Sequence, residues 1–140
     1  DSYCKIYTLK DIIDYWILNT EIEGKIHQGM FFLMRENIFP LWDNEDNIKG
    51  LNFSFKILKE ESKKFWEKLS IAIVSESFLK DIYINEHKII NGISISPKKN
   101  FCIIKIWLKN KDLVSSENVK EYFNIPEEYT GDLIFKNHSE

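Results

Sequence analysis

Two β-rich runs joined by a short turn constrain the fold of this chain more than any other feature of its sequence. The runs cover residues 89–96 and 101–108, and only Pro97, two lysines and Asn100 lie between them. Strands joined by so short a connection pair in the antiparallel direction. The sequence therefore predicts a β-hairpin with a basic tip.

The remaining segments alternate between β-rich runs and helical patterns. Further strands are expected at residues 3–7, 30–35, 52–57 and 133–135. Helices are expected at residues 9–19, 59–76 and 116–123. No glycine-rich phosphate loop is present, and we expect the strand pairs to be hairpins. The pattern predicts an α+β fold in which one antiparallel sheet carries helices on one face.

The first expected helix is amphipathic. It begins after a capping box, in which the Thr8 hydroxyl and the Asp11 carboxylate satisfy its first free amides. Its apolar residues recur at helical spacing up to Trp16 and Ile17, and we expect it to end near Asn19. On this pattern alone, Trp16 is a core residue.

Composition limits the classes of function that the chain can have. Its 140 residues, of which 44% are hydrophobic, suit a single domain with one core. The net charge of -3 argues against binding of long nucleic acid through its phosphates, which needs a basic excess. No apolar run approaches the ~20 residues of a membrane span.

Cys4 and Cys102 are interpreted as buried free thiols, with a disulfide as the alternative. The histidines show no metal-ligand spacing.

A tryptophan beside a carboxylate lies in the polar stretch of residues 39–50. Trp42 follows an apolar run, and Asp43, Glu45 and Asp46 come after it. An indole ring can stack on a cationic purine, and a neighbouring carboxylate can accept hydrogen bonds from the purine's N–H edge. The alternatives are an ordinary tryptophan at the end of a loop with solvated carboxylates, and an acid–base pair of an enzyme. The residues alone leave these alternatives open.

Collinear motifs along the chain resemble the eukaryotic initiation factor 4E family. The matching segments are residues 8–16, 39–50, 52–57, 64–69, 74–78, 91–96 and 104–107. They are similar to the family's first helix, its Pro-φ-Trp-Glu loop, the next strand, the long helix with a Phe-Trp pair and a Gly-Glu-Ser-Phe end, and the hairpin. The resemblance implies a curved antiparallel sheet with three helices packed on its convex face. Residues 1–140 would form a single cap-binding domain that lacks the family's N-terminal strand and loop.

The resemblance also implies a site for the 7-methylguanosine cap of mRNA in the concave face. Trp42 would stack on the methylated guanine, Asp43 would bind its Watson–Crick edge, and Trp107 would approach the 7-methyl group. Lys98 stands at the position of a phosphate-binding Arg, with Lys99 beside it. For Trp107 the alternative is a core residue of a strand, and for the two lysines it is a solvated turn.

Several positions depart from the family's pattern. Asp43 is one methylene shorter than the usual Glu, Asn52 replaces an Arg, and Ile103 replaces a phosphate-binding Lys. The second stacking Trp belongs to a loop before the first helix that this sequence does not include. Each such loss is expected to cost ~1 kcal/mol or more of cap affinity.

A second site is implied on the convex helical face. In the family, the residue that matches Trp16 is exposed and receives a helical Tyr-x4-Leu-φ peptide from the 4G scaffold or from repressor proteins. Ile12, Ile71 and Ser75 match further contact positions. Glu67 replaces a Leu that contacts the peptide in the family, which is expected to alter the choice of partner.

The sequence is interpreted as that of a cytoplasmic, monomeric translation initiation factor that binds capped mRNA and a scaffold or repressor peptide. No catalysis, cofactor, metal or membrane is expected. The alternative within the fold is a divergent repressor or partner-binding module with weak or no cap binding. A small nucleotide-handling enzyme that uses residues 43–46 is a third hypothesis, which no nucleophile or phosphate loop supports.

Overall fold

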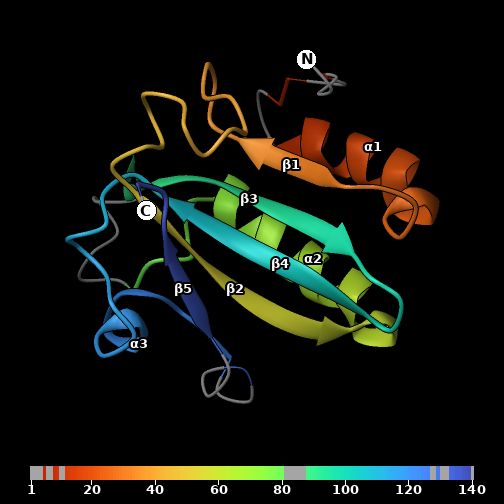
Figure 1. The fold of residues 1–140 in the computed structure, drawn as a ribbon. Helices are drawn as coiled ribbons and strands as arrows, with labels where there is room; N and C mark the ends of the chain where they lie inside the picture. Colours follow the sequence, from red (N-terminus) through yellow and green to blue (C-terminus); the bar gives the residue numbers. More distant parts are fainter. Residues whose placement is uncertain are drawn as a thin grey trace.

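The protein is described by a computed structural model (Figure 1). The structure describes Lys5, Thr8, Leu9 and residues 12–80, 88–126, 129 and 133–139. The elements, in chain order, are α1 (Ile12–Ile22), η1 (Glu23–Lys25), β1 (Phe31–Met34), β2 (Leu51–Leu58), α2 (Lys59–Val74), β3 (Ile90–Pro97), β4 (Phe101–Leu108), α3 (Val119–Tyr122) and β5 (Ile134–Asn137). The strand expected at residues 3–7 lies, apart from Lys5, outside the described residues.

The described strands form one antiparallel sheet in the order β1-β3-β4-β2-β5. The predicted hairpin is confirmed, because β3 and β4 pair and the Lys98 amide donates to the Phe101 carbonyl at 2.8 Å. The expectation that the other strand pairs are hairpins is wrong. β1 pairs with β3, and β2 pairs with β4 and β5. The strands that follow each other in sequence do not pair here, because a long loop separates β1 from β2 and helix α2 separates β2 from β3.

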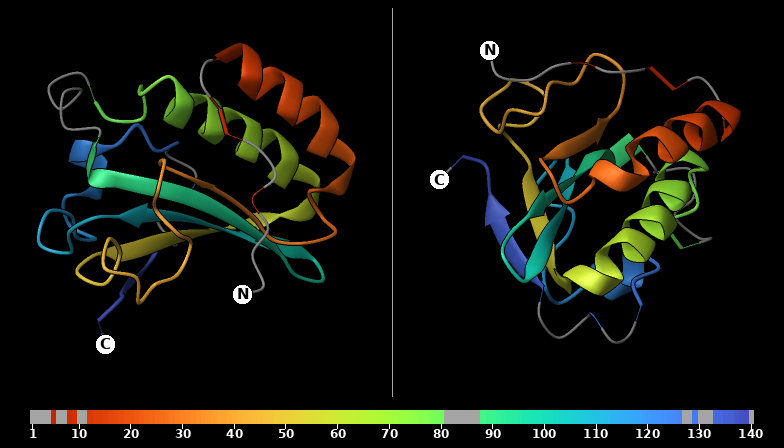
Figure 2. Two further views of the ribbon diagram at one scale, coloured as in Figure 1. Left: turned by 90° about the horizontal axis from the view of Figure 1, so that it is seen from above. Right: turned by 90° about the vertical axis from the view of Figure 1, so that its right-hand side faces the viewer.

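The helices lie on one face of the sheet, and the other face is open (Figure 2). The predicted alternation in β2 is confirmed, since Phe53, Phe55 and Ile57 are buried against the helical layer. α3 lies on the same side, because the ring of Phe123, which follows it, is 5.5 Å from that of Phe53. The described part of the chain therefore has the predicted α+β architecture, with three α-helices on one face of a curved sheet.

The prediction that Trp16 is a core residue, made from helical spacing, is wrong. Trp16 and Ile17 are 45% and 51% exposed, whereas Tyr15 is 4% exposed and its hydroxyl bonds to that of Ser70 at 2.7 Å. The reason is that α1 packs against α2 through the Tyr15 side. The side chains of Ile12 and Ile13 lie outside the described part of the structure.

The ends of the helices also differ from the predicted ones. α1 continues to Ile22 instead of ending near Asn19, and α3 has only 4 residues. α2 ends at Val74, because Glu76 adopts the left-handed region at φ 56° and the Ser77 amide donates to the Ala72 carbonyl at 2.8 Å. Cys102 is buried and free, as expected, and Cys4 lies outside the described residues.

Candidate functional site

The open face of the sheet brings together side chains that the strand alternation turns away from the core. Phe53 and Ile106 are paired core residues, so the next pair along, Asn52 and Trp107, faces the open side. Lys136 of β5 pairs with Asn52, which places the three side chains in one row across β4, β2 and β5. Trp107 thus belongs to the open face rather than to the helix-packed core.

The Trp107 ring is held firmly on this face. It is 6% exposed, and its Nε1–H donates to the Ser94 hydroxyl at 3.1 Å. The Phe32 ring stands edge-on at 6.2 Å and the His138 ring lies at 5.3 Å between centroids. These contacts leave only a small part of the indole accessible to a ligand.

Residues 37–50, called the Trp42 loop from here on, form most of the connection between β1 and β2. Trp42 is 55% exposed, Asp43 is exposed beside it, and Phe39 and Leu41 are also exposed. Four neighbouring residues therefore present two aromatic rings, an aliphatic side chain and a carboxylate to solvent. This composition suits a planar cationic ligand better than a structural turn.

The Trp42 loop owes its shape to the fully buried side chain of Asn47. The Asn47 amide donates to the carbonyls of Phe39 and Leu41 at 2.8 and 2.9 Å, on the side of the loop that precedes Trp42. Asn91 donates to the Asn47 side-chain oxygen at 3.0 Å. Asn91 can do so because it is the extra residue of a β-bulge in β3, which turns its side chain toward the loop.

Gly50 and His138 attach the end of the Trp42 loop to the sheet. Gly50 approaches β4 so closely that a Cβ there would lie 1.8 Å from the Leu108 carbonyl oxygen, so only glycine fits. The His138 amide donates to the Gly50 carbonyl at 3.0 Å, and the His138 ring bonds to the Asn47 carbonyl at 2.7 Å. Trp42 and Trp107 are therefore linked through Asn47 and His138.

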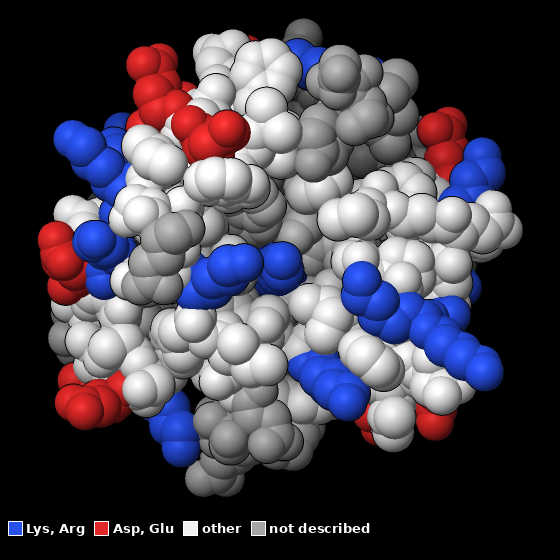
Figure 3. Space-filling model, in the orientation of Figure 1, with Lys and Arg blue, Asp and Glu red and all other residues white. Residues whose placement is uncertain are grey.

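Lysines give the open face a positive charge. Figure 3 shows Lys and Arg side chains across the middle of this face and carboxylates at its margins. The pKa of Lys105 is lowered, first by burial and then by the charges of Lys136 and Lys98. The predicted residues Lys98 and Lys99 lie at the exposed tip of the hairpin, whereas Lys105 is only two residues from Trp107 on the same face.

Lys105, Lys136 and His138 are not among the site residues predicted from the sequence. Lys105 lies two residues before Trp107 in the same strand, so their side chains point to the same face, and this alternation could have been read from the sequence. Lys136 and His138 reach the face only through the pairing of β5 with β2. Asn52 is not free for a ligand, because its amide donates to the His138 ring at 3.1 Å.

The predicted partner residues lie on the two long helices, which pack side by side (Figure 2). Trp16 is half-exposed on α1, and Ile71 is half-buried on α2. Ser75 is exposed just after α2, and its hydroxyl donates to the Ile71 carbonyl at 2.7 Å. The backbone of Ile12 begins α1, but its side chain is not among those described.

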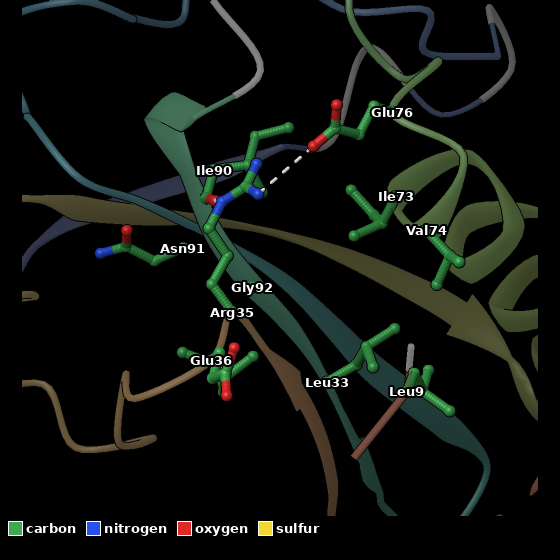
Figure 4. Close-up of a pocket in the computed structure, with 11 residues that line it drawn as sticks. Leu9, Leu33, Arg35, Glu36, Ile73, Val74, Glu76, Ile90, Asn91 and Gly92 are labelled. Atoms are coloured by element: carbon green, nitrogen blue, oxygen red, sulfur yellow. Dashed lines mark hydrogen bonds and ion pairs between the residues drawn. The ribbon is translucent and has the colours of Figure 1, made fainter. Parts of the chain in front are cut away.

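A hollow of 470 Å³ lies between β1, β3 and the end of α2 (Figure 4). Its walls are mainly apolar, and Arg35 crosses it to form an ion pair with Glu76 at 3.5 Å. The Arg35 Nε also donates to the Ile90 carbonyl at 2.6 Å. None of the predicted ligand or partner residues lines it.

No helix among the described residues is both long and apolar enough to span a membrane. No group of three or more His, Cys, Asp or Glu side chains within the described part of the chain has a geometry suited to a metal ion.

Comparisons with known proteins agree on one family. The model of the family described as eukaryotic initiation factor 4E matches residues 1–140. The rice initiation factor NCBP is 20% identical over 137 residues, which are 92% of this chain and 58% of that protein. An initiation factor 4E homolog of Acanthamoeba polyphaga mimivirus is 28% identical over 107 residues, which are 68% of this chain and 39% of the homolog. The chain thus spans about half the length of the curated relatives it matches.

Solved structures share the fold. Ascaris suum eIF4E-3 in complex with the m2,2,7G cap has a TM-score of 0.74 at 20% identity, and the match covers 96% of this chain and 78% of that one. C. elegans eIF4E-3 in complex with the 4E-binding protein Mextli and a cap analog has a TM-score of 0.74 at 24% identity, with coverage of 96% and 79%. At these identities the likeness establishes the fold.

Proposed function

We propose, since this chain belongs to the eukaryotic initiation factor 4E family, that it binds the 7-methylguanosine cap of mRNA on the open face of its sheet and acts in translation initiation. The observation that carries the proposal is the pairing of an exposed Trp42 with Asp43 on a loop whose backbone is tied to the sheet. The cap-bound nematode neighbours have the same fold and support the proposal.

The chemistry of the Trp42 loop favours the methylated base over ordinary guanine. Methylation at N7 gives the ring a positive charge, which adds about 0.5–2 kcal/mol to its stacking on an indole. The same charge strengthens the hydrogen bonds that the base donates to the Asp43 carboxylate. Because Asn47 holds the carbonyls beside Trp42, little ordering of the loop is needed on binding.

We assign the phosphates of the cap to the lysines of the open face. Lys105 lies nearest to Trp107 along β4, with Lys136 one strand beyond Asn52 and Lys98 and Lys99 toward the hairpin tip. The ammonium groups of Lys105, Lys136 and Lys98 repel one another, and an anion that lies between them stabilises all three. Since an ammonium is a point charge, it cannot make the two parallel bonds of an Arg, and binding by Lys105 should depend strongly on salt.

The proposed partner is a helical peptide of a scaffold or repressor protein, bound on the helical face. An exposed tryptophan and a half-buried aliphatic residue on adjacent helices suit the anchoring of such a helix, and Trp16 on α1 and Ile71 on α2 supply these side chains. Ile12 and Ser75 are proposed to complete the surface. The proposal places the protein in the cytoplasm as a monomer, with no catalytic step and no cofactor.

The test is the quenching of tryptophan fluorescence by 7-methyl-GTP, with GTP as the control ligand. Wild type, Trp42→Ala, Asp43→Asn and Asp46→Asn are compared, where Asp46→Asn removes an exposed carboxylate of the same loop as a matched control. We expect saturable quenching by 7-methyl-GTP alone, lost in Trp42→Ala and weakened about tenfold or more in Asp43→Asn. Equal responses to both nucleotides in the wild type would refute cap binding.

One observation favours a second candidate, a divergent repressor or partner-binding module with weak cap affinity. Asn52 supplies no cation and its amide is committed to His138, and Ile103 supplies no cation either. In that case the wild type and all three variants would show no quenching by 7-methyl-GTP, while a Tyr-x4-Leu-φ peptide would still bind the helical face.

A further inference from the structure

His138 is a buried residue that connects the Trp42 loop to the sheet. Its ring is 4% exposed and contacts three structural units: the Asn47 carbonyl of the loop at 2.7 Å, the Asn52 amide of β2 at 3.1 Å, and the Trp107 ring of β4 at 5.3 Å. We call the first two contacts the His138 bridge.

The His138 bridge requires one protonation state of the ring. The Asn47 carbonyl can only accept, so Nδ1 must carry a hydrogen and donate it. Nε2 then has a free lone pair, which accepts from the Asn52 amide. The bridge therefore selects the neutral tautomer with the hydrogen on Nδ1.

A second proton would place a charge in an unfavourable environment. The pKa of His138 is lowered, mainly because the ring is buried. The bond to the Asn47 carbonyl acts in the opposite direction and raises the pKa, and the charges of Lys105 and Lys136 lower it further. These lysines come from β4 and β5, whereas β2 and the bulge of β3 contribute the neutral amides of Asn52 and Asn91. A flip of the Asn52 amide would restore its hydrogen bond, but the buried charge beside two ammonium groups would remain.

We propose that His138 is a positioning residue that keeps the Trp42 loop in its binding shape, and that protonation of its ring releases the loop. A second proton on Nε2 leaves the Nδ1–H bond to the Asn47 carbonyl in place, so release requires the charged ring to move from its buried position into solvent. The end of the loop then loses the bond from His138 to the carbonyl of Asn47, the residue whose side chain holds the carbonyls of Phe39 and Leu41. Trp42 and Asp43 are thereby separated from Trp107. The effect on ligand binding rests on the proposed function, but the release of the loop does not.

The sign of the pH effect follows from linkage. A neutral histidine is favoured in the closed state, so the open state binds more protons between the lowered pKa and the ordinary value of about 6.5. The stabilisation by His138 is complete above about pH 6.5 and is lost as the pH falls toward the lowered pKa. Between these two values the ratio of closed to open state falls by up to about tenfold for each pH unit, and below the lowered pKa His138 contributes no further change.

The experiment uses two readouts that need no ligand. The 15N chemical shifts of the His138 ring report its tautomer, and hydrogen exchange of the Trp42 loop amides, measured between pH 7.5 and 4.5, reports release of the loop. Wild type is compared with His138→Asn, whose amide can donate to the Asn47 carbonyl without titrating. His27→Asn is the matched control, because the His27 ring bonds to Ser62 away from the loop.

The 15N shifts are expected to show the Nδ1–H tautomer of His138. As the pH falls, the amides of the Trp42 loop are expected to exchange faster in wild type than in His138→Asn, and His27→Asn should behave as wild type. An Nε2–H tautomer, or loop exchange that follows the same pH course in wild type and His138→Asn, would overturn the proposal. Titrations with 7-methyl-GTP at the same pH values form a separate arm. If wild type fails to bind at pH 7.5, the proposed function fails while the exchange data still decide the role of His138.

Discussion

Replacement of Asn47 by Ala tests whether one buried amide determines the shape of the Trp42 loop. The change removes three hydrogen bonds, two to the carbonyls of Phe39 and Leu41 and one from Asn91. Each of these three partners keeps a second hydrogen bond. The Phe39 carbonyl still accepts from the Leu41 amide, and the Leu41 carbonyl still accepts from the Asn44 amide. The Asn91 side chain still donates to the Asp46 carbonyl, so none of the three is left unsatisfied. The cost is therefore about 1 kcal/mol for each bond lost, or about 3 kcal/mol of unfolding free energy in total.

Urea denaturation of Asn47→Ala, followed by circular dichroism, measures this loss. Asn44→Ala is the matched control, since the Asn44 side chain makes a single exposed bond to the Asp46 amide at 3.1 Å. The control is expected to lose less than about 1 kcal/mol. If Asn47→Ala were no less stable than Asn44→Ala, the loop would not depend on the buried amide and the reasoning would be wrong.

Three further substitutions have defined outcomes. Gly50→Ala should destabilise the fold by at least about 3 kcal/mol, because the new Cβ would lie 1.8 Å from the carbonyl oxygen of the last β4 residue, and thermal unfolding will show whether it does. Trp16→Ala should abolish binding of a Tyr-x4-Leu-φ peptide in calorimetry yet change stability by less than about 1 kcal/mol, because the ring is 45% exposed; unaltered affinity would exclude this surface. Lys105→Met should weaken binding of 7-methyl-GTP and reduce its salt dependence, whereas Lys120→Met on α3 should do neither, and equal effects would dismiss the assigned phosphate site.

Local patterns predicted the parts of the fold in which a residue's orientation follows from its sequence neighbours. The hairpin of β3 and β4 and the buried face of β2 belong to this group, because strand alternation reports which side chains share a face. The same rule would have placed Lys105 beside Trp107. Helical spacing did not predict which side of α1 is buried, because Tyr15 and Trp16 are adjacent and only the position of α2 decides between them.

The sequence by itself determined the secondary structure of the central sheet, the family and the nature of the exposed Trp42–Asp43 pair. Only the tertiary structure decided how that pair is held. The Asn47–His138 bond joins residues 91 positions apart, the Asn52–His138 bond spans 86, and the Asn91–Asn47 bond spans 44. No periodicity links residues so distant, since their contact depends on the β5–β2 pairing and on the bulge in β3. Which polar groups are buried together is therefore a property of the assembled sheet rather than of any segment.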